Sequence, residues 1–169
     1  MPRILAVRAA ILIGFLVTTG NTADLPNFAA YATRKTFRGK PAKPLLGNSA
    51  DRRFQEAVLA DTERGPTFAG HYTLVAWTCG TGCTHAIVVD AATGTLYHKM
   101  PFEMLLRAGL ERKQEPYSFR RDSRLLIVQG YFDIEFANKD SECSRRYYEW
   151  TGRAFRLLRK AVLMCTPTP

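Results

Sequence analysis

Two cysteines separated by three residues are the side chains in this sequence best suited to bind a metal or carry out redox chemistry. Cys79 and Cys83 bracket Gly80-Thr81-Gly82, and His85 follows two residues later. Thiolate and imidazole groups bind zinc and copper, but structural zinc sites favour a two-residue spacing and need a fourth ligand, which the nearby sequence lacks. Disulfide oxidoreductases and covalent haem attachment also use a two-residue spacing. We therefore expect neither a metal nor another cofactor here.

The other two of the four cysteines are Cys143 and Cys165. An even number of cysteines in an exported chain predicts disulfides, and four cysteines allow three pairings. We favour Cys79–Cys83, because the two glycines between these cysteines let the chain turn back over a short span. The second pair is then Cys143–Cys165, which joins the end of a predicted hairpin to the C-terminal tail.

Residues 1–23 have the composition of a secretory signal peptide. Arg3 and Arg8 are their only charged residues, an apolar run covers residues 9–17, and the expected cleavage site follows Ala23. The run is too short for a bilayer core, which takes about 20 helical residues to cross. Residues 24–169 then form a single globular domain. We expect a periplasmic or secreted protein with no stable membrane insertion after cleavage.

Side chains suited to catalysis are scattered through the sequence. Neither Gly-x-Ser-x-Gly nor His-Glu-x-x-His occurs. The sequence therefore favours a protein that is not an enzyme, and a small hydrolase with His71 or His85 as its base is the alternative. A pocket beside one of these histidines, with an acid directed toward it, would favour the hydrolase.

The formal net charge is +9, and the basic residues crowd the C-terminal half. Among them are Arg120, Arg121, Arg124, Arg145, Arg146, Arg153, Arg156, Arg159 and Lys160. Interleaved aromatic residues (Tyr147, Tyr148 and Trp150) are typical of a platform for single-stranded nucleic acid. Because an exported protein seldom meets nucleic acid, we expect no such partner, although a cationic binder of the envelope surface is an alternative. The simplest interpretation is a solvated face whose arginines pair with Asp122, Glu142 and Glu149.

Periodicity predicts one domain with two helices and about six strands. Residues 24–47 form an extended lead-in, residues 50–61 a helix with Phe54, Val58 and Leu59 on one face, and residues 102–112 a second short helix. The predicted strands cover residues 71–78, 84–90, 95–98, 124–129, 147–150 and 153–158. The expected class is α+β, an antiparallel sheet of about six strands with one or two helices packed on one face.

Five short motifs between residues 66 and 158 carry a family resemblance. They are Phe68-Ala69-Gly70-His71-Tyr72, Trp77-Thr78-Cys79-Gly80-Thr81-Gly82-Cys83, Asp90 through Gly94, Asp122-Ser123-Arg124-Leu125-Leu126, and Tyr147-Tyr148-Glu149-Trp150 followed by Gly152. Together they resemble a family of small exported bacterial proteins, in which Cys-Gly-x-Gly-Cys is the most specific element. The resemblance implies export and this kind of fold, and it assigns no activity.

The short cysteine loop also resembles, in kind, the loop of exported inhibitors of vertebrate-type lysozyme. Those sheet-plus-helix proteins present a disulfide-closed loop to the cleft of the enzyme. Their loop holds a His and an acidic residue, whereas Gly80-Thr81-Gly82 has neither, so no residue role is transferred. A closed loop on a rigid sheet can enter the cleft of a partner or bind an anion with its backbone N–H groups.

These features predict an exported, non-enzymatic binding module. The expected binding residues are Gly80, Thr81 and Gly82, with His71 and His85 at the base of the loop. The expected partner is an envelope or host protein.

Overall fold

The computed structural model describes residues 24–47, 52, 54–80, 83–102, 105–106, 115–132 and 142–165, except for the side chains of Cys79 and Leu106. The predicted signal peptide lies outside these residues. In this described part of the chain, no helix is long and apolar enough to cross a membrane.

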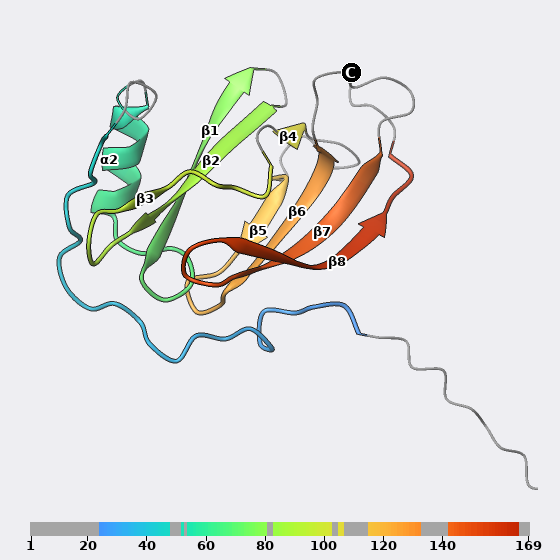
Figure 1. Cartoon of the computed structure of the whole chain (residues 1–169), viewed down its shortest axis with the longest axis horizontal. Helices are drawn as coiled ribbons and strands as arrows, with labels where there is room; N and C mark the ends of the chain where they lie inside the picture. Colours follow the sequence, from blue (N-terminus) through green and yellow to red (C-terminus); the bar gives the residue numbers. More distant parts are fainter. Residues whose placement is uncertain are drawn as a thin grey trace, which may run out of the picture.

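The described chain is mostly β structure (Figure 1). Its one helix is α2 (Gln55–Glu63). The strands are β1 (Tyr72–Gly80), β2 (Cys83–Asp90), β3 (Leu96–Tyr97), β4 (Leu105–Leu106), β5 (Tyr117–Phe119), β6 (Leu125–Phe132), β7 (Cys143–Trp150) and β8 (Phe155–Val162). Every pair of neighbouring strands is antiparallel.

The strands follow the order β1-β2-β4-β6-β7-β8, with β3 paired to β2 and β5 paired to β6. The hairpin of β1 and β2 forms one half of this arrangement, and β6, β7 and β8 form the other half. Among the strands that the structure describes, only the two-residue strand β4 pairs with both halves. The sheet therefore divides into two antiparallel parts, which Figure 1 shows on either side of β4.

The α+β prediction, with a sheet of about six strands and one or two helices, was wrong. Leu105 and Leu106, which lie inside the second predicted helix, form β4 by pairing with β2 and β6. The short strand β5 was not predicted at all. A run of a few apolar residues suits a buried strand as well as a helix, and pairing partners distant in the sequence decide between them.

Two apolar clusters pack on opposite faces of the β1–β2 hairpin. The larger cluster lies between the halves of the sheet, where the Tyr72 and Trp150 rings are 5.3 Å apart and the Phe68 and Phe155 rings 6.0 Å apart. In the smaller cluster, Val58 of α2 is fully buried against β1 and β2. The predicted apolar stripe of the helix thus fastens α2 to the outer face of the hairpin.

Residues 24–47, which we call the strap, cross one end of the strands (Figure 1). The strap packs against three turns that are far apart in sequence, which contain Gly70, Gly94 and Asp122. The N–H of Thr33 donates to the carbonyl of Asp122 at 2.8 Å, and the Ser123 hydroxyl donates to the carbonyl of Phe28 at 2.9 Å. The N–H of Leu45 donates to the carbonyl of Gly94 at 2.8 Å.

Two glycines make room for the strap. Gly70 and Gly94 have φ values of +88° and +76°, which disfavour a side chain. A Cβ at either residue would lie 2.1 Å from a strap carbonyl, that of Lys35 or Lys43 respectively. The strap therefore packs directly on the backbone of these two turns.

The predicted disulfide between Cys143 and Cys165 is confirmed. It joins the first residue of β7 to a residue three positions beyond β8, and so closes the end of the β7–β8 hairpin. Cys83 is also disulfide-bonded. The side chain of Cys79, its predicted partner, lies outside the described residues.

Candidate functional site

The loop that carries the predicted binding residues connects β1 to β2. We call residues 79–83 the glycine loop. Gly80 pairs with Cys83 across the end of the hairpin, where the register shifts by one residue, and Gly80 has a φ of +143°. Thr81 and Gly82, the other two predicted binding residues, lie outside the described part of the chain.

The two histidines expected at the base of this loop lie at opposite ends of the hairpin. His85 pairs with Trp77 near the loop. His71 precedes β1, and its backbone carbonyl accepts a hydrogen bond from the N–H of Ala91 at 2.9 Å. At about 3.3 Å per residue, the eight steps of β1 separate these ends by roughly 26 Å. His71 is therefore not at the base of the glycine loop.

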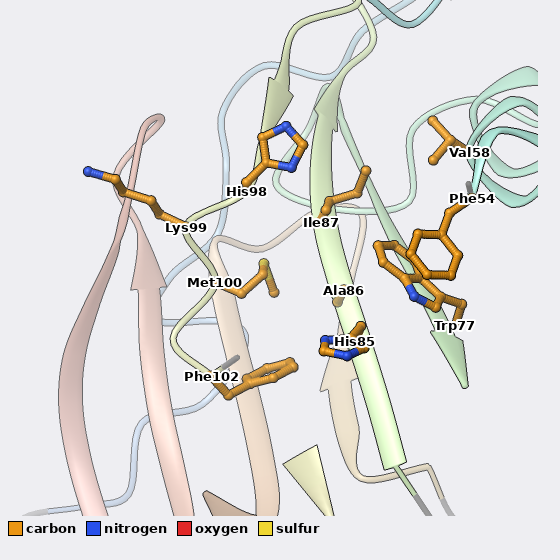
Figure 2. A pocket seen from close by; sticks show the side chains of 10 residues that line it. All are labelled: Phe54, Val58, Trp77, His85, Ala86, Ile87, His98, Lys99, Met100 and Phe102. Carbon is orange, nitrogen blue, oxygen red and sulfur yellow. The ribbon is translucent and has the colours of Figure 1, made fainter. Parts of the chain in front are cut away.

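A pocket of about 590 Å³ lies beside His85 (Figure 2). Its lining residues come from α2 and the residue before it, both hairpin strands and the segment after β3: Phe54, Val58, Trp77, His85, Ala86, Ile87, His98, Lys99, Met100 and Phe102. Figure 2 shows Phe54, Val58 and Trp77 on one side of β2 and His98, Met100 and Phe102 on the other. We call this cavity the β2 pocket.

Aromatic rings form one wall of the β2 pocket. The Phe54 and Trp77 rings stack with their centroids 4.4 Å apart, and the His85 ring lies 6.2 Å from that of Trp77. The indole N–H of Trp77 is buried and has no hydrogen-bond partner within the described structure. An unsatisfied buried donor costs about 1–3 kcal/mol, so an acceptor that reached it would be stabilised.

His71 lines a second pocket, of about 370 Å³, at the strap end of the hairpin. The Nε2 atom of His71 lies 3.8 Å from a carboxylate oxygen of the mostly buried Asp90. Arg34, Lys35 and Arg124 also line this pocket, which gives it a cationic wall.

Tyr72, the neighbour of His71, belongs to the same pocket. Burial raises the pKa of its hydroxyl above the ordinary value of 10.0, and the nearby Asp90 carboxylate adds to the rise. The phenol is therefore neutral at physiological pH, and its hydroxyl donates to the carbonyl of Gly152 at 3.4 Å.

The predicted pairing of the basic face with acidic residues is confirmed. Arg120 pairs with Asp122, and Lys160 pairs with Glu142. Arg124 and Arg156 both pair with Glu149, whose side chain is only 8% exposed. Much of this positive charge therefore balances acidic groups within the protein.

The aromatic residues interleaved with these arginines are buried. Tyr147, Tyr148 and Trp150 expose 4%, 6% and 1% of their surface. Bases stack on exposed aromatic faces, so these three rings do not form a nucleic-acid platform. Within the described residues, no three His, Cys, Asp or Glu side chains gather closely enough to hold a metal ion.

Sequence reasoning identified His85 but missed the far wall of the β2 pocket. Lys99, Met100 and Phe102 follow β3 without forming a strand, and no motif marks them. Met100 and Phe102 lie beside β2 only because the chain leaves the sheet between β3 and β4, and Lys99 extends away from β2 (Figure 2). No family model, curated protein or solved structure matches this chain.

Proposed function

We propose that this protein is an exported, disulfide-stabilised, non-enzymatic binding module that recognises an envelope protein through the loop end of the β1–β2 hairpin. The observation that carries the proposal is the β2 pocket, whose aromatic wall at Trp77 and His85 lies three residues or fewer from the glycine loop. The loop and the pocket thus lie at the same end of the hairpin, where one partner could contact both.

The composition of the β2 pocket supports recognition rather than a purely structural role. Ligand sites are mostly apolar, contain a few polar groups and have volumes of roughly 300–1,000 Å³. The β2 pocket combines Phe54, Trp77 and Phe102 with two imidazoles and one ammonium group. The Cys143–Cys165 disulfide is compatible with an oxidising compartment outside the cytoplasm.

A charge placed on the glycine loop tests the proposal. Wild-type protein, Thr81→Lys and the matched control Ala92→Lys, in the exposed turn at the other end of β2, serve as bait in envelope extracts with chemical cross-linking. We expect a wild-type partner that Ala92→Lys retains and Thr81→Lys loses. Unfolding free energies should agree within about 0.5 kcal/mol, as for other surface substitutions. Equal capture by both variants would refute recognition at the loop end.

A small hydrolase is the second candidate, and the His71–Asp90 pair favours it. The pair lies in a pocket with Arg34, Lys35 and Arg124, which suit an anionic substrate. The test is turnover of 4-nitrophenyl acetate and 4-nitrophenyl phosphate. Activity that His71→Ala abolishes and His85→Ala retains would support a hydrolase. Absence of turnover by the wild type would exclude both ester classes.

A further inference from the structure

The strap carries positive charge that no acidic residue in the described structure neutralises. In the sequence, no Asp or Glu occurs between Asp24 and Asp51. The basic residues in this interval are all exposed: Arg34, Lys35, Arg38, Lys40 and Lys43. None of them forms an ion pair with a residue that the structure describes, whereas several basic residues of the C-terminal half do. The strap is therefore a continuous source of uncompensated charge.

Backbone hydrogen bonds hold this charge outside the end of the strands. The N–H of Phe37 donates to the carbonyl of Gly70 at 2.8 Å. The N–H of Ala42 donates to the carbonyl of Ala91, also at 2.8 Å. Because backbone groups make these contacts, the basic side chains of the strap stay exposed to solvent. Figure 1 shows the strap along the outside of the strand ends.

Two hollows beside the strap have cationic walls. One is the pocket of about 370 Å³ that Arg34 and Lys35 line. The other has a volume of about 620 Å³ and is lined by Thr36, Arg38, Arg120, Arg121 and Asp122. The carboxylate of Asp122 accepts two hydrogen bonds from Arg120, so its charge is already balanced. Arginine and lysine side chains are the usual ligands of phosphate groups, so each hollow suits a phosphate.

We propose that the strap is a membrane-binding surface, which holds the protein on a bilayer that contains anionic phospholipids. Such bilayers attract cationic segments, and each Lys or Arg near the surface strengthens binding about fivefold. This partner is separate from the protein recognised at the loop end. The glycine loop lies at the other end of β1, roughly 26 Å from the turn at Gly70, so one molecule can engage both partners.

The extent and composition of the strap favour a bilayer over a small anion or a soluble polyanion. The chain from Arg34 to Lys43 spans up to about 30 Å when extended, which distributes the charges over more than one phosphate group. Two apolar side chains of the strap, those of Leu25 and Leu45, are 50% and 64% exposed. Leucine side chains gain from contact with the acyl boundary of a bilayer, whereas a soluble polyanion offers them no apolar surface.

Co-sedimentation with vesicles tests the proposal on protein purified after export. The vesicles contain phosphatidylcholine alone, or phosphatidylcholine and phosphatidylglycerol in equal parts. We expect binding to the anionic vesicles only, and a steep loss of binding as salt is added, because ions screen exposed charges. Equal binding to both kinds of vesicle, or no binding to the anionic vesicles, would overturn the proposal.

Two matched double variants locate the binding surface. Arg34→Gln with Arg38→Gln removes one charge beside each hollow, and Arg159→Gln with Lys160→Gln removes two charges from β8. We expect the strap variant to bind anionic vesicles about thirtyfold more weakly and the β8 variant to change by less than about threefold. Equal losses would show a response to net charge alone and would refute a binding surface on the strap.

A second comparison separates a bilayer from an anionic polymer. We expect Leu45→Ser to weaken binding to anionic vesicles several-fold, while Leu157→Ser, a matched control on β8 with 51% exposure, leaves it unchanged. Protein that binds dextran sulfate but not anionic vesicles would identify a polyanion surface and overturn the proposal. Vesicle binding should survive in Thr81→Lys, so that the loop end and the strap fail independently.

Discussion

Replacing Gly70 by Ala should destabilise the protein by displacing the strap. The added Cβ would lie 2.1 Å from the carbonyl oxygen of Lys35, which is backbone and cannot rotate away. Gly65 is a matched control, because its φ of +92° nearly equals the +88° of Gly70 but nothing lies within 4 Å of its Cβ position. The two substitutions share backbone strain and differ in the contact with the strap.

The expected magnitudes follow from these contacts. A non-glycine residue in left-handed conformation costs about 1–2 kcal/mol, which is the whole expected effect of Gly65→Ala. Displacement of the strap at Gly70 also removes the hydrogen bond from the Phe37 N–H to the Gly70 carbonyl and the one from Arg121 to the Phe37 carbonyl. At about 1 kcal/mol each, these losses bring Gly70→Ala to about 3–4 kcal/mol.

Urea unfolding of both variants with their disulfides intact measures these free energies. Trypsin gives a second readout, since Arg34, Lys35 and Arg38 lie in the strap and become better substrates once it detaches. We expect faster cleavage in Gly70→Ala than in Gly65→Ala under native conditions. Equal unfolding free energies and equal cleavage rates would show that the strap does not rest on Gly70 and would refute this reasoning.

Two further predictions concern the disulfide and Tyr72. Replacing Cys143 and Cys165 together by Ser should lower the unfolding free energy by about 3 kcal/mol, as expected for a loop of separation 22, and a loss under 1 kcal/mol in urea unfolding would contradict this. Because burial raises the pKa of Tyr72, the unfolded chain releases this proton first, so stability should fall as the pH rises above about 10. Tyr72→Phe should reduce the loss of stability between pH 9 and pH 11, and an unchanged loss would contradict the assigned pKa shift.

Strands with partners close in sequence were predictable. The strands predicted at residues 71–78 and 84–90 are joined by a short connection, and they correspond to β1 and β2. The hairpin of β7 and β8 was likewise found around Thr151-Gly152. By contrast, Leu105 becomes a strand residue only through Thr84 and Phe132, which are distant in sequence. No local pattern carries that information, so this segment was predicted as a helix.

The candidate site was likewise predictable only where its residues are close together in the sequence. The position of His85 beside the glycine loop follows from its place two residues beyond Cys83. His71 is also near the loop in sequence, but the rise of an extended strand carries it to the far end of the hairpin. The wall of the β2 pocket at Met100 and Phe102 depends on the path of the chain between β3 and β4. That feature arises from tertiary pairing and leaves no mark in the sequence.

Strand β8 gives a further meaning to the basic C-terminal half. It is the last strand in the pairing order, and it carries one extra residue opposite Tyr147 and Tyr148. Arg156, Arg159 and Lys160 lie along it and are exposed. An exposed edge invites pairing with another chain, whereas a bulge and like charges oppose it. The bulge and the long basic side chains of β8 therefore oppose the addition of a strand from a second molecule, so this edge is protected from sheet-to-sheet aggregation.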